Sequence, residues 1–458
     1  ILVRLILLPL MIKQQNSMDN MQKIQPELNA IQKKYQNDKE KLNEDEIKCM
    51  INGYVNDEIP DYQMSAWLMA VCFNSLTTDE TLILTETMRD SGDILDLSSI
   101  HGITVDKHST GGVGDKTSLV IAPICASCGI YVPKMSGRGL GFTGGTIDKL
   151  ESIPGFQVNI DFNKYIDIIN KNGAAIIAQS GHLVPADKKL YALRDVTATV
   201  DSIPLICSSI MSKKLATGAD CILLDVKTGS GAFMKNIDDA QNLAELMVHV
   251  GQNAGKKCRA IITDMNEPLG NAIGNSLEVI EVCEILSGRE KGKLYELCIA
   301  LAANMMELGG LGSLEDCTRL AEDAITSGRA IDTFKKMIEA QGGNPNITED
   351  YSLFKRAAYK CELKAEKSGY ISSIDSEKIG MVALLTGAGR RNKNDNIDSS
   401  AGTILNKHVG DCVDQGDVIM TFYSSVVKNF DEVINKAADA VEISGIMPKI
   451  SPVVIKII

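Results

Sequence analysis

The sequence has no excess of positive charge and no apolar run long enough to cross a membrane. Its 47 lysine and arginine residues are outnumbered by 59 aspartate and glutamate residues, which gives a formal net charge of −12. Because nucleic-acid binding depends on clustered basic charge, nucleic acid is excluded as a partner, and any small anion must be held by a local site. The apolar start, ILVRLILLPLMI, is shorter than the about 20 residues of a spanning helix.

Paired cysteines are also missing. The 12 cysteines follow no regular spacing, and no secretory signal is recognisable, so we expect a reduced, cytoplasmic protein. Cys125 and Cys128 form a C-x-x-C motif within APICASCGI, but no second Cys or His pair lies at zinc spacing. Their neighbours are small and apolar, so the motif predicts two buried thiols beside a helix.

The pattern of apolar residues changes along the chain. Three- and four-residue spacing predicts helices across residues 45–89, and the last of them, in TTDETLILTETMRDSG, has a threonine cap and acids in its first turn. Strand-like runs then alternate with helical ones, which predicts an α/β fold. After residue 357, short strands and Gly-Asp turns predict a separate β-rich domain. GDCVDQGD there resembles a lipoyl-type barrel-sandwich hairpin, but no lysine stands at its tip, so we expect the architecture without that cofactor.

Two glycine-rich loops carry much of the polar chemistry. They are KHSTGGVGD at residues 107–115 and SGRGLGFTGGT at residues 136–146. Glycines let backbone N–H groups turn toward an anion, hydroxyls add donors, and lysine adds a charge. Each loop has the pattern of a strand-to-helix turn, where the helix N-terminus favours negative charge. We expect a phosphate cradle, with glycine turns beside a solvated lysine as the plain alternative.

Two nucleotide-binding motifs nearly match these loops. In GVGDKTS, Asp115 separates Gly114 from Lys116 and breaks the Gly-Lys-Thr sequence that a P-loop requires. A G-x-G-x-x-G spacing begins at Gly139, but the acid expected about 20 residues later falls in VNIDFNK, which does not have the pattern of a strand end. Neither a P-loop nor NAD binding is therefore predicted.

A third cluster lies in YALRDVTATVDSIPLICSSIMSKKLA. Ser209 and Lys213 are four residues apart and share one face of a predicted helix, and Arg194 precedes them. An arginine, a hydroxyl and a lysine together suit a neutral ring with carbonyl and N–H groups. From the residues alone, a solvated helix face remains an equal alternative.

SGRGLGFTGGTIDKLESIPGF, residues 136–156, resembles the signature of the thymidine and pyrimidine-nucleoside phosphorylases. KHSTGGVGD, LYALRDVTATVDSIPLICSSIMSKK and LDVKTGSGAFMK are similar to that family too, and the likeness runs from about residue 45 to the C-terminus. It implies a homodimer with a small all-α domain hinged to a larger α/β domain, and a C-terminal barrel-sandwich-like α+β domain. We assign residues 47–95 and 186–218 to the α-domain, 96–185 and 219–345 to the α/β domain, and 357–458 to the C-terminal domain.

The resemblance also implies the site residues. The pyrimidine would be held by His108, Arg194, Ser209 and Lys213, of which His108, Arg194 and Lys213 would be catalytic. Closure of the α-domain on the α/β domain would bring base and phosphate together. Phosphate would be held by Lys107, Ser109, Ser118, Lys134, Ser136 and Thr146.

The implied reaction is reversible phosphorolysis of uridine, thymidine and deoxyuridine to the free base and an α-D-(deoxy)ribose 1-phosphate. Lys134 favours acceptance of both uridine and thymidine, because the broad enzymes resemble this chain in having lysine there, whereas thymidine-restricted relatives tend to have methionine. The alternatives are a thymidine-restricted phosphorylase and an anthranilate-type phosphoribosyltransferase. The latter would need an acidic magnesium site near the first loop.

No organic cofactor is implied. The broad enzymes resemble one another in a structural potassium site, and the matching positions are Gly114, Lys116, Leu269, Ala272 and Glu281. Relatives tend to have threonine where Lys116 stands. If the ligand there is a main-chain carbonyl, the ion is kept; if it is the side chain, the lysine ammonium replaces the ion. Phe142 is a second departure, since histidine is common at its position.

Residues 1–46 stand apart from the rest. LPL, MQ, QPEL and IQKKY within them resemble a fragment of the YidC-type membrane protein insertases, so we interpret this stretch as a leader foreign to the fold. It also motivates a third hypothesis, a membrane-associated assembly protein that contacts a bilayer through residues 1–12.

Overall fold

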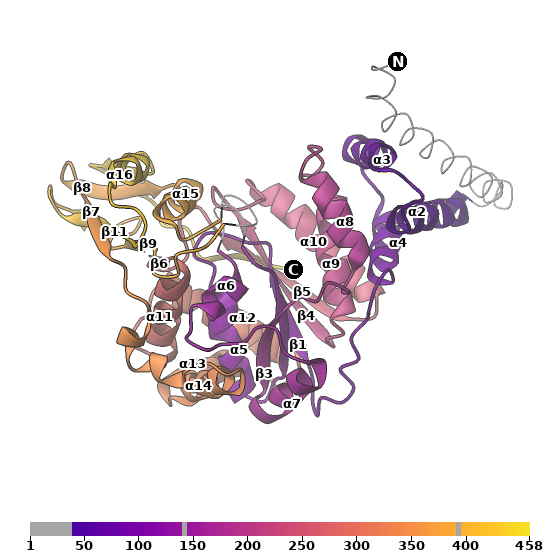
Figure 1. The fold of residues 1–458 in the computed structure, drawn as a ribbon, viewed down its shortest axis with the longest axis horizontal. Coiled ribbons are helices and arrows are strands. Elements are labelled where there is room, and N and C mark those ends of the chain that lie inside the picture. Colours follow the sequence, from indigo (N-terminus) through magenta and orange to yellow (C-terminus); the bar gives the residue numbers. More distant parts are fainter. Residues whose placement is uncertain (1–38, 140–143, 391–394) are drawn as a thin grey trace, which may run out of the picture. The chain divides into compact units, whose positions relative to one another are not determined.

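The computed structural model describes residues 39–139, 144–390 and 395–458 (Figure 1). The insertase-like stretch up to residue 38, the contact predicted for residues 1–12 and Phe142 lie outside the described residues. Within them, no helix has both the length and the apolar content needed to cross a bilayer. None of the twelve cysteines forms a disulfide. Cys125 is buried, as predicted, but Cys128, also predicted to be buried, is only half-buried, because it lies at the C-terminal end of helix α5 (Thr117–Ser127).

The chain divides into two compact units. The helical unit takes the described residues up to Asp96, together with 180–218 and 246–256. The α/β unit takes residues 97–179, 219–245 and 257–458, so the C-terminal β-rich region belongs to it. This division differs from the predicted domains in keeping the C-terminal region with the α/β unit and in giving residues 180–185 and 246–256 to the helical unit. Residues 39–46, predicted to belong to a foreign leader, also lie in the helical unit, because they form the start of helix α2 (Lys39–Val55). The predicted closure of one domain on the other stays a prediction.

Short sequence signals, such as a residue that caps a helix, predict the helices of the helical unit well. The predicted threonine cap is confirmed, because Thr77 Oγ1 accepts a hydrogen bond from Glu80 N at 3.2 Å and the Glu80 carboxylate accepts one from Thr77 N at 2.8 Å. Thr85 Oγ1 then donates to Ser208 Oγ at 3.1 Å between two buried helix faces. The unit contains α2 (Lys39–Val55), α3 (Asp61–Asn74), α4 (Thr78–Arg89), α8 (Pro185–Arg194), α9 (Ile203–Ala216) and the second part of α10 (Ile237–Asn253).

The main sheet of the α/β unit has strand order β1-β4-β5-β13. The strands are β1 (Val105–Ser109), β4 (Cys221–Thr228), β5 (Lys257–Asp264) and β13 (Val454–Ile457). The first three are parallel, with Ser109 opposite Asp225 and Asp225 opposite Ile261. β13 adds antiparallel to β5, with Val454 opposite Thr263. Residues 357–458 were all predicted in a separate domain, but their last strand returns to the main sheet.

Two further strands, β2 (Val132–Ser136) and β3 (Ala174–Ala178), pair in parallel. A parallel bridge from Thr104 to Tyr131 places β2 alongside β1. Ser109 and Ser136 each lie five residues beyond this bridge, so both strands end at the same edge. Helices pack around these strands: α5 (Thr117–Ser127), α6 (Thr146–Glu151), α7 (Phe162–Asn172), α11 (Asn275–Leu286), α12 (Lys293–Leu308), α13 (Leu314–Thr326) and α14 (Arg329–Ala340).

The core of this unit is built around α5. Leu119, Val120, Ile121 and Ile124 are each no more than 2% exposed, and α5 packs against α12 and α14. A helix that is apolar on all sides must be buried on all sides, which accounts for its central place. Its N-terminus is therefore held rigidly beside the ends of β1 and β2.

The C-terminal region forms two small sheets. Their strand orders are β10-β8-β12 and β6-β9-β11-β7. The GDCVDQGD run contains β10 and the turn that leads to β11, but these two strands belong to different sheets and do not pair with each other, so the run is not a hairpin in the strict sense. The predicted fold class itself is confirmed. The second sheet includes β6 (Ala272–Ile273), which comes from the segment before α11. The elements of the C-terminal region itself are β7 (Tyr359–Lys364), β8 (Gly369–Ile374), α15 (Ser376–Thr386), β9 (Gly402–Leu405), β10 (Cys412–Val413), β11 (Val418–Ser424), α16 (Asp431–Ala438) and β12 (Val441–Ser444), preceded by the short 3-10 turns Pro345–Thr348 and Tyr351–Leu353.

Gln341, which follows α14, provides a test of the packing around β3. Its buried side chain donates to the carbonyls of Gln157 at 3.0 Å and Ile176 at 2.8 Å, and accepts from Ile176 N at 3.1 Å. We expect Gln341→Ala to lower the free energy of unfolding by about 2 to 4 kcal/mol, because buried polar groups left without partners cost about 1 to 3 kcal/mol each. Urea denaturation measures it, with the exposed Gln252→Ala as control. Equal effects of the two substitutions would contradict the role of Gln341.

Candidate active site

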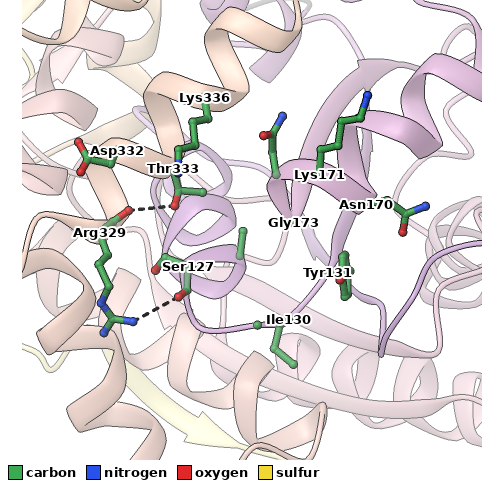
Figure 2. A pocket seen from close by; sticks show the side chains of 13 residues that line it. Ser127, Ile130, Tyr131, Asn170, Lys171, Gly173, Arg329, Asp332, Thr333 and Lys336 are labelled. Atoms are coloured by element: carbon green, nitrogen blue, oxygen red, sulfur yellow. Dashed lines mark hydrogen bonds between the residues drawn. The ribbon is translucent and has the colours of Figure 1, made fainter.

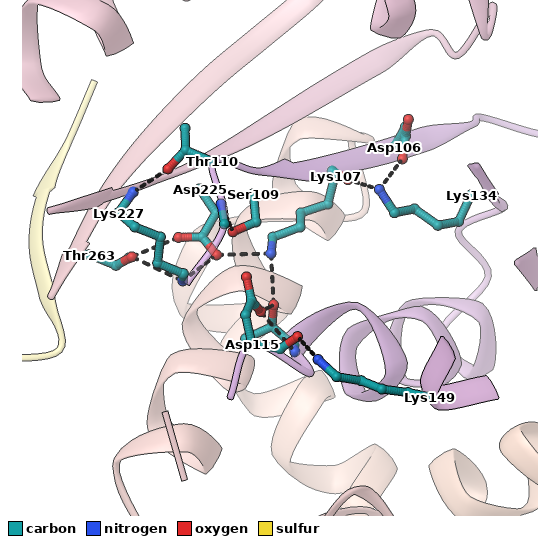
Figure 3. Close-up of polar contacts among 12 residues, drawn as sticks. Asp106, Lys107, Ser109, Thr110, Asp115, Lys134, Lys149, Asp225, Lys227 and Thr263 are labelled. Carbon is teal, nitrogen blue, oxygen red and sulfur yellow. Dashed lines mark hydrogen bonds and ion pairs between the residues drawn. The ribbon is translucent and has the colours of Figure 1, made fainter. Parts of the chain in front are cut away.

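Lys107 lies at the centre of a buried ionic cluster where β1 ends (Figure 3). Its Nζ is 2.9 Å from Asp225 Oδ2 and donates to Thr117 Oγ1 at 2.7 Å, which uses two of its three N–H groups. The side chain is 1% exposed. Burial by itself lowers the pKa of Lys107, but the carboxylates of Asp115 and Asp225 outweigh it and raise that pKa. Lys107 therefore stays charged at neutral pH.

Asp225 of β4 pairs with two lysines, Lys107 of the adjacent strand β1 and Lys227 of its own strand. Its Oδ2 also pairs with Lys227 Nζ at 2.7 Å, and its Oδ1 accepts from Thr263 Oγ1 at 2.7 Å. Both Asp225 and Lys227 are fully buried. Burial raises the pKa of Asp225, but the two ammonium groups outweigh it, so the pKa is lowered.

Asp115, which breaks the P-loop pattern, has a structural task in the first loop. Its Oδ1 accepts from Thr117 Oγ1 at 2.6 Å and from Thr117 N at 3.2 Å. Burial opposes its ionisation, yet Lys107 and Lys227 hold the pKa of Asp115 well below its ordinary value. The acid thus stays ionised and ties the end of the loop to the first residue of α5.

The predicted phosphate hydroxyls lie at the ends of strands and the starts of helices in the α/β unit. Ser109 ends β1, Ser118 is the second residue of α5, Ser136 ends β2 and Thr146 begins α6, and all four are half-buried. Ser109 Oγ accepts from Gly111 N at 3.2 Å and so shapes the loop from inside. The strand ends and the start of α5 are where an α/β sheet offers backbone N–H groups to an anion.

Two residues that sequence reasoning missed hold the second loop. Lys149 Nζ donates to Asp115 O at 2.7 Å and pairs with Glu278 at 2.8 Å, which ties α6 to the first loop. Asp148 accepts from Gly139 N at 2.7 Å and pairs with Arg390 at 2.8 Å. Asp225 and Lys227 were not predicted as site residues, although two charges inside the apolar run CILLDVKTG were a usable signal.

Lys134 takes a different place from the other predicted phosphate residues. Its ammonium donates to the main-chain carbonyl of Lys107 at 2.5 Å and lies 3.6 Å from Asp106, with 6% of the residue exposed. Figure 3 shows it on the Asp106 side of β1, away from the Lys107 ammonium. His108 follows Lys107 in β1 and is half-buried.

The helical unit carries the predicted pyrimidine cluster. The expected helix-face pairing is present, since Lys213 Nζ donates to Ser209 Oγ at 3.1 Å across one turn of α9. Lys213 also pairs with Asp187 of α8 at 2.5 Å, and Asp187 is buried. Asp187 was not predicted, because nothing in PADKKLYALR distinguishes it from a solvated acid. It fixes the Lys213 ammonium beside the Ser209 hydroxyl.

Arg194 organises the loop between α8 and α9. Its guanidinium donates to the carbonyls of Thr199 at 3.0 Å, Val200 at 2.8 Å and Leu205 at 3.1 Å, and the residue is 3% exposed. Burial lowers the pKa of Arg194, an effect that the nearby Asp187 opposes. A guanidinium has five N–H donors, so these three bonds leave two for a ligand.

Three matching families and several curated relatives identify the kind of protein. The glycosyl transferase family, a/b domain, matches residues 101–331; the pyrimidine nucleoside phosphorylase C-terminal domain matches 370–444; and the glycosyl transferase family, helical bundle domain, matches 28–92. A pyrimidine-nucleoside phosphorylase of Geobacillus stearothermophilus is 52% identical over 88% of this chain and 93% of its own length. One from Staphylococcus haemolyticus is 51% identical over 89% and 94%. The chain belongs to the pyrimidine-nucleoside phosphorylase family.

A solved anthranilate phosphoribosyltransferase from Thermus thermophilus is also similar, with a TM-score of 0.52 and 17% identity over 66% of this chain and 95% of that chain. At this identity the likeness shows the fold alone. The helical-bundle match begins at residue 28, inside the stretch interpreted as a foreign leader. No comparison supports the insertase resemblance.

A pocket of about 420 Å³ lies elsewhere on this phosphorylase-family chain (Figure 2). It is lined by Ser127 at the C-terminal end of α5, by Tyr131 and Gly173 before β2 and β3, and by residues of α14. None of the predicted site residues lines it. Because α/β sheets bind ligands at the carboxyl ends of their strands, this pocket at the amino ends is not the candidate site.

A side chain occupies the positions where the resemblance implied a potassium ion. Lys116 Nζ donates to the carbonyls of Leu269 and Ala272 and to Glu281 Oε2, at 2.9, 2.7 and 2.6 Å. Gly114 touches the same turn with a φ of +73°, and a Cβ there would lie 2.5 Å from Leu269 O. The ammonium thus stands where the resemblance implied an ion.

Asp225 offers a pH-resolved test of the buried cluster. We expect Asp225→Asn to lower the free energy of unfolding at neutral pH by about 3 to 5 kcal/mol, because two buried ammonium groups lose their carboxylate. The lowered pKa means that Asp225 contributes fully above its ordinary value of 3.8, and that this contribution is lost as the pH falls through the lowered value.

Urea unfolding of the parent and of Asp225→Asn across this pH range measures the effect. The exposed Asp439→Asn is the control. A difference in stability that widened on acidification would contradict the assignment.

Proposed function

We propose that the protein catalyses the reversible phosphorolysis of pyrimidine nucleosides, namely uridine, thymidine and deoxyuridine. The observation that carries this is the family membership, at about half identity over nine-tenths of the chain, with relatives named pyrimidine-nucleoside phosphorylases. The Lys107 cluster and the Lys213 cluster supply the two kinds of group that the reaction needs. The first holds phosphate in this proposal, and the second holds the pyrimidine.

The chemistry follows from charge. A phosphate oxygen forms a bond to the anomeric carbon from the face opposite the base, while the bond from that carbon to the ring nitrogen breaks. The sugar gains positive character, the electron pair of the broken bond goes to the pyrimidine, and the product is an α-sugar 1-phosphate. Lys213 and Arg194 stabilise the negative charge that develops on the ring carbonyls. His108 donates a proton or a hydrogen bond at the carbonyl beside the departing nitrogen.

The phosphate side works by alignment. Ser109, Ser118, Ser136 and Thr146 donate hydrogen bonds from the ends of β1 and β2 and the starts of α5 and α6, and Lys107 supplies the charge. Because Asp225 and Thr117 hold the Lys107 ammonium, its remaining N–H group has one direction available, which favours a fixed pose for the nucleophile.

The remaining parts of the proposal rest on the family alone. They are a homodimeric assembly and a place in the cytoplasm. An anthranilate-type phosphoribosyltransferase is not favoured. It shares the fold with this chain, but Lys213, Ser209 and Arg194 suit a ring with carbonyl groups, and no cluster of three or more acidic, histidine or cysteine residues suited to a metal occurs in the described part of the chain.

The decisive assay is release of uracil from uridine with and without phosphate. We expect release to require phosphate, and Lys213→Gln to lower kcat/KM by about 100- to 1,000-fold, because an electrostatic donor to the transition state is lost. Lys188→Gln, an exposed lysine of the neighbouring helix α8, is the matched control and should keep the parent rate. Phosphate-independent release, or a Lys213→Gln enzyme with the parent kcat, would refute the proposal.

Lys134 tests the choice between broad and thymidine-restricted activity. We expect the parent to cleave both uridine and thymidine, and Lys134→Met to lose uridine activity selectively by about 10- to 100-fold, the value of one charged hydrogen bond. Because Lys134 also pairs with the buried Asp106, the melting temperature must be measured beside the rates. Cleavage of thymidine alone by the parent would favour the restricted alternative. Equal losses on both nucleosides with lowered stability would mean that Lys134 only supports β1.

A further inference from the structure

The Lys116 ammonium is enclosed by three oxygen atoms from a distant part of the chain. The bonds run to Leu269 O at 2.9 Å, Ala272 O at 2.7 Å and Glu281 Oε2 at 2.6 Å. An ammonium has three N–H groups, so each is used once. The side chains of Lys116 and Glu281 are 0% and 6% exposed.

The donors around the ammonium suit a monovalent cation. All three are oxygens, two of them neutral carbonyls and one a carboxylate, so their single negative charge is balanced by one positive charge. Calcium and magnesium prefer six or more oxygens, usually with several carboxylates or waters. An ammonium group resembles a potassium ion in charge and size, and this one lies within hydrogen-bond distance of all three oxygens.

The oxygens are held in place independently of Lys116. Glu281 Oε1 accepts from Asn271 N at 2.6 Å, and Oε2 also accepts from Ala272 N at 2.9 Å. Gly270 has a φ of +71°, and a Cβ there would lie 2.3 Å from Glu281 Oε1, so only glycine lets the turn wrap the carboxylate this closely. The turn at residues 269–272 and Glu281 thus form a ready-made oxygen cage.

A potassium ion does not fit this cage in the chain as it stands, because the Lys116 ammonium already lies among the three oxygens. We infer that Lys116 is a built-in replacement for a bound monovalent cation. It holds the turn at residues 269–272 against the start of α5, and no metal ion is required. Lys116 is the N-cap residue of α5, directly before Thr117 and Ser118, so the same bonds also fix the helix start in the Lys107 cluster.

The inference is tested by stability rather than activity, so its outcome is independent of the proposed function. Melting temperatures are measured in potassium, sodium and tetramethylammonium chloride at equal ionic strength. The proteins are the parent, Lys116→Ser, Lys116→Ser with Glu281→Gln, and the exposed control Lys367→Ser. Serine empties the cage without adding charge, and tetramethylammonium is too large to enter it.

We expect the parent and Lys367→Ser to melt at the same temperature in potassium and tetramethylammonium chloride. Lys116→Ser should melt lower in tetramethylammonium chloride and regain about 2 to 5 °C in saturating potassium, because a ligand that binds only the folded state stabilises it. Adding Glu281→Gln should abolish this response, because the cage loses its negative charge.

Two results would overturn the inference. One is a specific potassium response of the parent, and the other is a Lys116→Ser protein that no monovalent cation stabilises. If Lys116→Ser cannot be purified, crystals of the parent protein grown in rubidium chloride test whether a monovalent cation binds among the three oxygens. The absence of anomalous scattering among Leu269 O, Ala272 O and Glu281 supports the inference, and a rubidium peak there overturns it.

Discussion

Buried ammonium groups need oxygen partners, and the edge where β1 and β4 end is organised around this requirement. Lys107, Lys116, Lys149 and Lys227 are each no more than 1% exposed. A buried charge is tolerated only when it is paired and hydrogen-bonded. Asp225, Glu278 and Glu281 supply the acids, and main-chain carbonyls supply most of the remaining bonds. Removing any one of these acids would leave a buried ammonium group without its carboxylate partner. The ion pairs and hydrogen bonds therefore fix the loops that carry the predicted phosphate-binding residues.

This arrangement also explains how a strongly acidic chain can bind an anion. The field of the whole protein, with a net charge of −12, disfavours phosphate, so recognition must be local. Within the Lys107 cluster, two lysines face Asp115 and Asp225, and the charges nearly cancel. Attraction therefore depends on directed donors, which are the hydroxyls at the strand ends and the backbone at the start of α5. Positioning contributes more to such a site than net charge does.

Lys116 and Lys134 show how one residue type acquires different tasks from its surroundings. Both are buried in the same unit, and both donate to main-chain carbonyls. Lys116 is enclosed by three oxygens and completes a turn. Lys134 lies beside Asp106 on the other side of β1 from the Lys107 ammonium (Figure 3). The residue type indicated a charge at each position, but the surrounding oxygens decide what the charge does.

Much of the fold could be predicted from the sequence because its signals are local. Apolar periodicity located the helices and the parallel strands, Thr77 marked a helix start, and a spacing of four residues placed Ser209 beside Lys213. The residue types of the two loops predicted anion chemistry before any geometry was known. These features depend on neighbours within one or two turns of the chain, so a short window of sequence contains them.

Only the tertiary structure decided which residues pair with the lysines and which strand pairs with the last one. Lys116 meets a carbonyl 153 residues away, Lys107 and Lys227 share Asp225, Lys213 meets Asp187 across two helices, and the last strand pairs with β5 rather than with its own neighbours. No local pattern encodes such pairings, because they depend on which segments the whole chain brings together. The sequence by itself determined which groups carry charge and which segments form helices and strands. The folded chain determined which charge neutralises which, because that follows from the burial of distant residues around one common core.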